Sequence, residues 1–357
     1  MFFRDIYSHS ILGKPKRSSW DMKTTLVVAA LHAIRFSFRN GGLKLWRSFA
    51  RIPYLLSNPN QYHSASFKVK KLGLPGILSN FDSHESGTRE VEAHWLLPLE
   101  ESKNDEGKII FYLHGGGYCA KDWQAYYTLN QQLSKYTKRP VFSLSYRLAP
   151  ETRFPGALVD AFQGYNHLIT EYKINPKDIT IVGDSAGGGL AIALLVYLRD
   201  HAYPLPETSI LISPWVDLTY SHQSWVNAEG HDYLPSRPDF NALMNPARFY
   251  LGPEQYHKLC RHPYASPLFM EDYDNLPPIL IQSGGSETMT DEVRTFADKF
   301  IECKNTMSKH EEYEDMIHDF QVYPLSKSDV AFLNIQKWIS FDIKRPRKLY
   351  STNREII

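Results

Sequence analysis

Cysteine is scarce in this sequence, and acceptor sites for N-linked glycosylation are absent. The three cysteines, Cys119, Cys260 and Cys303, lie far apart in a chain of 357 residues, and no Asn-x-Ser/Thr triplet occurs. An odd number of widely spaced cysteines does not predict a disulfide framework. The N-terminal residues also lack the apolar core of a secretion signal. Together these absences predict a cytoplasmic protein.

Long hydrophobic runs and a strong net charge are missing as well. The most apolar stretch near the N-terminus, residues 26–34, is too short to cross a bilayer. The formal net charge is +1, so the chain as a whole has no strong attraction to nucleic acid. Residues 1–52 nevertheless hold ten Lys or Arg against two Asp. This basic segment predicts a solvated helix face, and the alternatives are peripheral contact with anionic lipid, for example on the endoplasmic reticulum, or with an acidic partner.

Short apolar runs alternate with helical patterns along most of the chain. Continuous Val, Ile and Leu runs suit strands that are buried on both faces of a parallel sheet. The alternation of such strands with helices predicts an α/β fold with a mostly parallel, doubly wound sheet. The strand candidates are residues 90–97, 108–113, 141–147, 178–183, 209–213 and 278–284, and the helical patterns are 123–137, 156–173 and 186–201.

Two segments fall outside this alternation and predict a cap over the sheet. Residues 21–56 have the apolar spacing of two helices that are joined by a turn. Residues 218–275 are rich in Pro, His, Tyr and Trp without a clear strand, and insertions of this length are usually functional. The expected organisation is N-terminal cap helices in residues 1–60, an α/β domain in 61–345 with a cap insertion at about 218–275, and a basic tail in 346–357.

A candidate nucleophile follows the strand expected at residues 178–183. The sequence GDSAG (183–187) fits the pattern G-x-S-x-G, in which small residues on both sides of the serine permit a very tight strand-to-helix turn. The turn lifts the hydroxyl of Ser185 to the tip of the sheet, and the helix that follows adds backbone donors and a positive dipole end. The strand before the pattern and the apolar helix after it are the context that this chemistry requires.

A serine hydroxyl needs a general base and an acidic residue that orients the base. Where this turn carries the serine, an acid and then a histidine follow it along the chain. His318, one of fourteen histidines, follows a further expected strand, HEEYED (310–315), and is predicted as the base. Glu287 lies in the loop after the preceding strand, whereas Asp291 and Glu292 lie where the next helix begins and match helix capping. Glu287 is therefore predicted as the acid, with Asp291 as the alternative.

The sequence HGGG (114–117) follows the strand expected at residues 108–113. Backbone N–H groups of a glycine loop can bind a stable phosphate or a transient oxyanion. No Lys-Ser/Thr follows the glycines, which disfavours the phosphate. The loop is therefore expected to donate the N–H groups of Gly116 and Gly117, with Gly115 as an alternative, and Ala186 is expected to add a further donor. The histidine is expected to brace the loop through hydrogen bonds.

Five short segments occur in a specific order and spacing over roughly residues 108–340. They are HGGGY (114–118), YRLAPETRFPGAL (146–158), GDSAGGGLA (183–191), SPWVDLT (213–219) and MIHDF (316–320). In wording and order they resemble the hormone-sensitive-lipase-like branch of the α/β-hydrolases. This resemblance implies an eight-stranded sheet with a helical cap and the hydrolysis of carboxylic esters without a metal or cofactor. It aligns Glu287 with the family's catalytic aspartate. In the second segment, Arg147 and Glu151 are expected to pair and fix the following loop.

The predicted function is a serine esterase that acts on a small-molecule ester. Short-acyl esters are expected, and acetyl esters of a bulky apolar alcohol such as a sterol are the leading case. The aromatic residues of the cap support this expectation, because they would line an apolar pocket or pack the cap itself. A catalytically silent small-molecule receptor on the same fold, and an amidase or deacetylase with the same triad, are the alternatives. The cap aromatics in question are Trp225, Tyr233, Phe249 and Tyr250.

Overall fold

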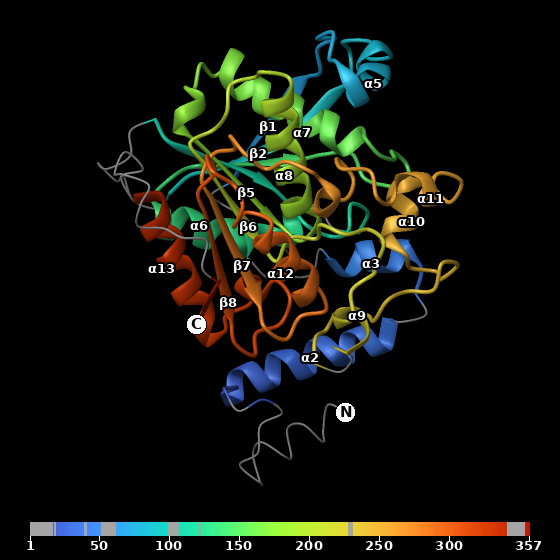
Figure 1. Ribbon diagram of the computed structural model, residues 1–357, viewed down its shortest axis with the longest axis vertical. Helices are drawn as coiled ribbons and strands as arrows, with labels where there is room; N and C mark the ends of the chain where they lie inside the picture. The colour runs from blue at the N-terminus through green and yellow to red at the C-terminus, as the bar shows by residue number, and fades with distance from the viewer. Residues whose placement is uncertain are drawn as a thin grey trace.

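The computed structural model shows one mixed sheet of nine strands in the part of the chain that it describes (Figure 1). The described residues are 17, 19–38, 41–50, 62–98, 107–120, 123–227, 231–340 and 354–357. The strand order is β1-β2-β4-β3-β5-β6-β7-β8-β9. β2 runs antiparallel to β1 and β4, and every other pair of neighbours is parallel. The strands are β1 (Tyr62–Lys68), β2 (Glu90–Leu96), β3 (Ile109–Leu113), β4 (Val141–Ser145), β5 (Ile179–Asp184), β6 (Thr208–Ile212), β7 (Ile279–Gly284), β8 (Ser308–Tyr313) and β9 (Arg354–Ile356).

This mostly parallel sheet confirms the predicted fold class, although its two edge strands were not predicted. β1 has the sequence YHSASFK, and six of its seven residues are exposed or half-buried. β9 has three exposed residues and pairs with β8 inside the predicted basic tail. Neither edge strand has the continuous apolar run that is typical of strands buried on both faces. The described sheet therefore has nine strands where the family resemblance implied eight.

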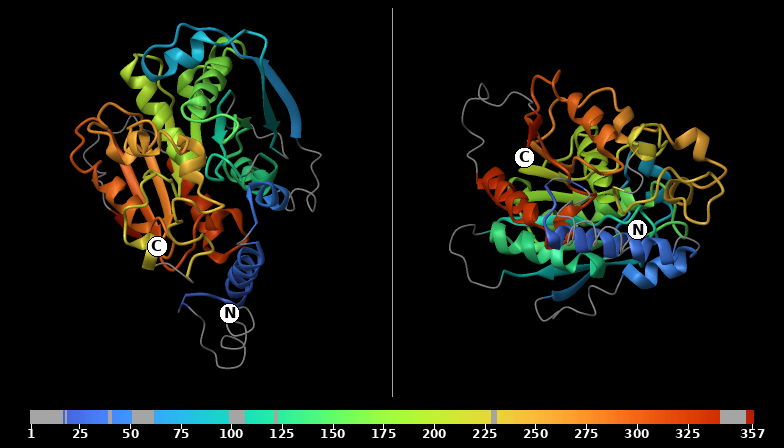
Figure 2. Two further views of the ribbon diagram at one scale, coloured as in Figure 1. Left: turned by 90° about the vertical axis from the view of Figure 1, so that its right-hand side faces the viewer. Right: turned by 90° about the horizontal axis from the view of Figure 1, so that it is seen from below.

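Helices cover both faces of the sheet because successive residues of the buried strands point to opposite sides (Figure 2). In β3, Ile110 and Tyr112 pack in a cluster with residues of α6 and α13, whereas Phe111 and Leu113 pack in a cluster with residues of α7, α8 and α12. All five residues of β3 are buried. The bounds are α6 (Tyr127–Thr137) and α13 (Ser326–Ser340) on one face, and α7 (Gly156–Thr170), α8 (Ala186–Asp200) and α12 (Thr290–Asp298) on the other.

The N-terminal helices contact the loops at the carboxyl end of the sheet. Trp20 packs with Met316 and Ile317 of the loop after β8, and its indole N–H donates to the carbonyl of Asp315 over 2.8 Å. Figure 1 shows α2 along the lower edge of the molecule. The assignment of these N-terminal helices to the cap stays a prediction, because residues 1–16 and 51–61 lie outside the described part of the chain. The helices are α2 (Met22–Phe38) and α3 (Leu43–Ala50).

The predicted cap insertion, residues 218–275, consists of short helices and loops. Polar side chains in this stretch form hydrogen bonds to backbone groups of the same stretch. For example, the hydroxyl of Tyr256 donates to the carbonyl of Leu218 over 3.0 Å. None of the described helices, here or elsewhere, has both the length and the apolar character needed to cross a bilayer. The short helices are α9 (Ser224–Asn227), α10 (Pro246–Leu251), α11 (Tyr256–Leu259) and η4 (Pro267–Phe269), and those elsewhere are η1 (Gly76–Leu78), α5 (Ser79–Ser83), η2 (Trp123–Tyr126), η3 (Pro176–Asp178) and η5 (Phe320–Val322).

Candidate active site

Ser185 lies in a sharp turn between β5 and α8. Its backbone has φ 51° and ψ −121°, a conformation that residues with a side chain rarely adopt. Two hydrogen bonds hold the turn: the N–H of Ser185 donates to the carbonyl of Ile212, and its carbonyl accepts from the N–H of Trp215, each over 2.8 Å. The neighbouring strand β6 and the loop after it therefore maintain the strained serine at the tip of the sheet.

The glycines two residues before and after Ser185 are required by close backbone contacts. A Cβ atom on Gly183 would overlap the carbonyl of Gly187. A Cβ atom on Gly187 would overlap the carbonyl of Leu113 at the end of β3. Absence of side chains at both positions thus lets α8 begin directly under the serine and against β3.

His318 and Glu287 come from loops after β8 and β7 and meet in the interior. The Nδ1 atom of His318 lies 3.2 Å from Oε2 of Glu287. Both side chains are almost completely buried. Asp291, the alternative acid, instead accepts a hydrogen bond of 2.9 Å from the backbone N–H of Ser224. Of the two acids predicted from the sequence, the structure brings Glu287 to the histidine.

The protonation of this pair follows from burial and from the charges around it. Burial raises the pKa of Glu287 to about 6, although the hydrogen bond from His318 acts in the opposite direction. Burial alone would lower the pKa of His318, but the carboxylates of Asp319 and Glu287 raise it well above its usual range. At neutral pH, Glu287 is therefore ionised and can hold a proton on Nδ1 of the imidazole.

Two carboxylates beside His318 were not identified from the sequence. Oδ2 of Asp319 lies 3.1 Å from Nε2 of His318. Asp232 accepts hydrogen bonds from the backbone N–H groups of His318, at 3.2 Å, and Thr288, at 2.9 Å. The position of Asp319 directly after the histidine could have identified it from the sequence. Asp232 reaches the site from a distant loop, and nothing in the sequence pointed to it.

The glycine loop offers backbone donors next to the turn of Ser185. The N–H of Gly115 is already engaged, because it donates to Oδ1 of Asp184 over 2.9 Å. Gly116 and Gly117 have φ values of 101° and 62°. Within the described residues, the N–H groups of Gly116, Gly117 and Ala186 form no hydrogen bond. These are the three donors that the sequence predicts for an oxyanion, and the alternative, Gly115, is occupied.

His114 braces this loop as expected. Its Nδ1 atom lies 2.8 Å from the carbonyl oxygen of Gly115. Its ring stacks on that of Tyr146 with 4.2 Å between the centroids, and the hydroxyl of Tyr146 donates to the carbonyl of His114. The loop is thus fixed by side chains from its own first residue and from the end of β4.

The expected pairing of Arg147 with Glu151 is wrong. Arg147 instead binds Asp160 of α7, with distances of 3.0 Å from Nε to Oδ2 and 2.9 Å from Nη2 to Oδ1. Glu151 binds Arg47 of the N-terminal helix α3 with two contacts of 2.7 and 2.8 Å. The partners were missed because both lie in other elements, and proximity in sequence favoured the wrong pair.

Arg47 connects α3 to the loops of the site. Besides Glu151, it donates to the carbonyls of Cys119 and Ala149, each over 2.8 Å. Cys119 follows the glycine loop by two residues, and the N–H of Ala149 donates to the carbonyl of Tyr118. The guanidinium therefore fastens the far end of the glycine loop to the loop after β4.

We expect Arg47→Ala to lower kcat for the ester hydrolysis predicted from the sequence by roughly 5- to 10-fold, because its hydrogen bonds to the carbonyls of Cys119 and Ala149, which fasten the glycine loop to the loop after β4, are lost. Glu151→Gln is the matched control, since it removes the exposed ion pair and leaves both bonds to backbone carbonyls in place. Steady-state kinetics of the two variants measure the effect. Equal kcat for Arg47→Ala and the unaltered enzyme would contradict this role.

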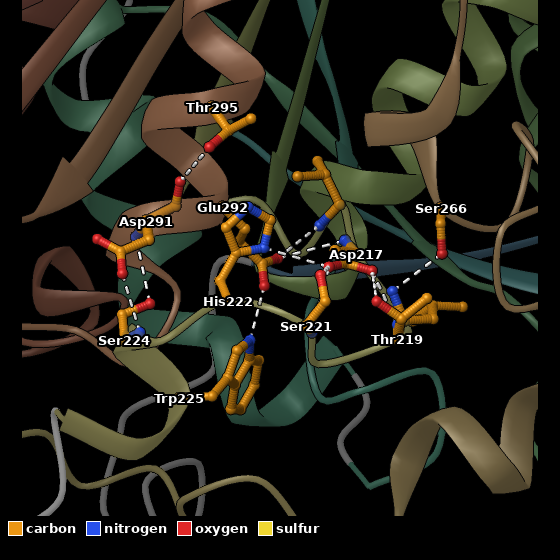
Figure 3. A network of polar contacts seen from close by, with 12 residues as sticks. Asp217, Thr219, Ser221, His222, Ser224, Trp225, Ser266, Asp291, Glu292 and Thr295 are labelled. Carbon is orange, nitrogen blue, oxygen red and sulfur yellow. Dashed lines mark hydrogen bonds and ion pairs between the residues drawn. The ribbon is translucent and has the colours of Figure 1, made fainter.

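Glu292 was interpreted as a helix cap, and that interpretation is wrong. Its side chain is buried and accepts hydrogen bonds from three donors outside α12, namely the backbone N–H groups of Val216 and Asp217 and the indole N–H of Trp225 (Figure 3). Burial and the nearby charge of Asp217 raise the pKa of Glu292 well above its usual range. Glu292 therefore joins the loop after β6 to the first turn of α12.

Asp217, His222 and Glu292 form a cluster with the residue types of a metal site. Their ligand atoms lie within 4.8 Å of one another. Burial would raise the pKa of Asp217, but hydrogen bonds from His222, Thr219 and Ser221 lower it to about 2. Every carboxylate oxygen of the cluster already accepts a hydrogen bond from the protein. These bonds account for the cluster as a structural network (Figure 3).

Replacing Glu292 with alanine is expected to destabilise the fold by roughly 3 kcal/mol or more, since three buried donors lose their acceptor. Asp291→Ala is the matched comparison on the same turn, because its carboxylate is more exposed and its loss is expected to cost about 1 kcal/mol. Urea denaturation of both variants gives the two values. If the Glu292→Ala protein is as stable as the Asp291→Ala protein, Glu292 does not hold the loop after β6 against α12.

The cap aromatics do not all face the histidine. Tyr250 is buried and stacks on Tyr118, with 3.8 Å between the centroids. Trp225 is buried and bonded to Glu292. Tyr233 differs, because its ring lies 6.2 Å from that of His318. Contacts with Glu292 and Tyr118 therefore account for Trp225 and Tyr250, whereas Tyr233 lies beside the candidate base.

Known proteins resemble this chain in sequence and fold. Residues 110–322 match a family described as having the α/β-hydrolase fold. An acetyl-hydrolase of Streptomyces hygroscopicus is 34% identical over 231 residues, which are 65% of this chain and 73% of that protein. An esterase of Acinetobacter venetianus is 34% identical over 216 residues, which are 60% of this chain and 68% of the relative.

A solved structure extends the likeness beyond the residues that match the family. The crystal structure of an esterase from the bacterial hormone-sensitive lipase family has a TM-score of 0.72 and 26% sequence identity. The match covers 88% of this chain and 96% of that esterase. Most of this chain thus has a structural counterpart in an esterase.

Proposed function

Since the chain belongs to this α/β-hydrolase family, in its hormone-sensitive-lipase-like branch of carboxylic ester hydrolases, we propose that it cleaves esters through Ser185, His318 and Glu287. The observation that carries the proposal is the turn of Ser185 together with the 3.2 Å contact between His318 and Glu287. A strained serine at a helix N-terminus and a buried histidine–carboxylate pair are the parts that acyl transfer requires.

In the proposed reaction, the hydroxyl of Ser185 attacks the ester carbonyl, and Nε2 of His318 takes its proton. Glu287 accepts a hydrogen bond from Nδ1 and stabilises the imidazolium that forms. The N–H groups of Gly116, Gly117 and Ala186 donate to the developing oxyanion. The imidazolium then gives its proton to the leaving alcohol, which departs and leaves an acyl group on the serine. Water hydrolyses the acyl-enzyme by the same steps, and the free acid leaves.

Short-acyl esters, and acetyl esters of a bulky apolar alcohol such as a sterol in particular, are the proposed substrates. Support comes from the relative named as an acetyl-hydrolase and from the aromatic side of the site at Tyr233. An apolar alcohol would pack against that ring, while a short acyl group needs little space beside the glycine loop.

Hydrolysis of p-nitrophenyl esters from acetate to decanoate tests the acyl preference. We expect kcat/KM to be highest for acetate or butyrate, and fastest turnover on decanoate would contradict the short-acyl proposal. Release of a sterol from its acetate, compared with the same reaction of Ser185→Ala, tests the alcohol separately.

Peripheral contact with an anionic membrane is proposed for α2. Leu26 and Ile34 of this helix are 42% and 45% exposed, and the exposed Lys23 lies on the same side of the helix. Apolar side chains next to basic ones suit the headgroup region of anionic lipid. We expect co-sedimentation with phosphatidylserine vesicles that weakens with salt and with Leu26→Ser/Ile34→Ser. Equal sedimentation of this variant would contradict the assignment.

A further inference from the structure

The imidazole of His318 lies between two carboxylates. Its Nδ1 atom is 3.2 Å from Oε2 of Glu287, and its Nε2 atom is 3.1 Å from Oδ2 of Asp319. All three side chains are almost completely buried. Ionised carboxylates only accept hydrogen bonds, and imidazole donates from both nitrogens only when it is protonated. This geometry therefore fits an imidazolium in the resting protein.

The backbone fixes Asp319 in this position. Its φ and ψ are 49° and 38°, in the left-handed region that aspartate tolerates better than most residues with a side chain. Its N–H donates to the hydroxyl of Ser213 over 3.2 Å, at the start of the loop after β6. Its other oxygen, Oδ1, is buried and has no hydrogen-bond partner among the described residues. His318 is thus the charged partner that the described structure provides for this carboxylate.

Acidic and phenolic groups also lie near the ring. Asp232 contacts the backbone N–H of His318 from the cap, and the ring of Tyr233 lies beside it. On the sheet side of the site, burial is the largest cause that raises the pKa of Tyr112 and Tyr126, and the charges of Asp184 and Asp319 raise it further. The charges that act on the imidazole are those of Asp319 and Glu287, and both raise the pKa of His318. The nearby cation, Arg294 of α12, interacts with Glu287.

Nε2 is also the atom that must receive the proton of Ser185 in the proposed mechanism. A hydrogen bond from Nε2 to Asp319 occupies this nitrogen while the ring is protonated. Only after Nε2 has lost its proton can it accept another from the serine hydroxyl. Asp319 thus competes with Ser185 for the same nitrogen.

We propose that Asp319 is a positioning residue that holds His318 as an imidazolium in the resting enzyme and sets the pH above which Ser185 is activated. The inference rests on the proposed roles of Ser185 and His318. Its consequence is a shift in the acid limb of kcat/KM, which reports the base of the free enzyme. A base with a raised pKa stays protonated to higher pH, so activity appears only as the pH rises further.

The test is the pH dependence of kcat/KM for p-nitrophenyl acetate between pH 5 and 9.5. For the unaltered enzyme we expect the acid limb above the ordinary histidine value of about 6.5. Asp319→Asn keeps the shape and removes the charge, and we expect it to move this limb down by at least about one pH unit. Activity at pH 6, relative to the plateau, should then rise by roughly 10-fold. Asp319→Glu restores a carboxylate and is expected to return the limb toward its original position.

Asp329→Asn, at an exposed aspartate of α13 that binds Tyr136, is the control and is expected to leave the limb unchanged. An acid limb that is the same with Asp319→Asn as without it overturns the proposal. If Asp319→Asn does not fold, NMR titration of the His318 ring in the unaltered protein decides, with the signal assigned by its loss in His318→Gln. A midpoint above 7 supports the proposal, and a midpoint near 6.5 overturns it.

The failure of the proposed function has a separate signature. If Ser185→Ala or His318→Gln retains the activity, the assignment of the nucleophile or base is wrong. If both are inactive and the limb does not respond to Asp319→Asn, only the role of Asp319 is wrong.

Discussion

Replacing Ser185 with alanine is expected to lower kcat/KM for ester hydrolysis by roughly 10⁴- to 10⁶-fold. The variant keeps the glycine loop and His318 but has no atom that can form the acyl-enzyme. The residual rate would come from the oxyanion donors and from substrate binding alone. Stability should change little, because alanine occupies less space in the same turn. Initial rates with p-nitrophenyl acetate at a pH above the acid limb measure the loss.

Ser209→Ala is the matched control for this variant. Ser209 lies buried on the adjacent strand β6, and its hydroxyl donates to the carbonyl of Ile181 over 3.0 Å, away from the strand's carboxyl end. We expect its kcat/KM to stay within about 2-fold of the unaltered enzyme, because the loss of one buried hydrogen bond affects stability rather than chemistry. Loss of activity in both variants would indicate a general defect of the fold. Activity retained in Ser185→Ala would contradict the proposed nucleophile.

Replacing Glu287 with glutamine is expected to lower kcat by roughly 10⁴-fold. The amide keeps the volume of the side chain but no longer stabilises the imidazolium of His318, and it can hold the ring in the wrong tautomer. The carboxylate must be ionised to act, and burial raises its pKa to about 6. The charge of Glu287 is therefore present above that pH and lost below it, which adds to the fall of activity in acid.

Asp291→Asn separates the two candidate acids. Oδ1 of Asp291 lies 3.6 Å from Nη1 of Arg294, which is also in α12. The carboxylate of Asp291 also accepts a hydrogen bond from the backbone N–H of Ser224. Neither contact touches His318, so we expect kcat to fall by less than about 3-fold. Should Asp291→Asn lose the activity while Glu287→Gln keeps it, the acid has been assigned to the wrong residue. Kinetics of the two variants at one pH above 7 decide.

The sequence predicts the central part of the fold well because its strands are buried on both faces. β3 is a continuous apolar run, β5 and β7 begin with mostly apolar residues, and all three strands are buried throughout. Such apolar runs are visible in the sequence without knowledge of any partner. β1 is half-exposed and polar, and β9 is three residues long. Their strand conformation depends on pairing with β2 and β8, so their own sequences carry little signal.

Within the candidate site, short motifs predict the residues whose local backbone is special. Ser185 and the glycine loop depend on tight turns, and turn chemistry is encoded by neighbouring residues. Partners that come from distant elements were missed or mispaired. Arg47 binds Glu151 across about a hundred residues, and Glu292 binds the loop at Val216 in the interior. Such pairs arise from tertiary packing, for which sequence spacing gives no signal.

Labelling with a fluorophosphonate, followed by mass spectrometry of the digested protein, tests the central claim most directly. The reagent forms a covalent bond with an activated serine and mimics the tetrahedral intermediate. We predict one adduct, on the peptide that contains Ser185, which is strongly reduced in His318→Gln. An adduct on another serine, or the absence of any adduct in the folded unaltered protein, would contradict the assignment of Ser185 as the nucleophile of an esterase.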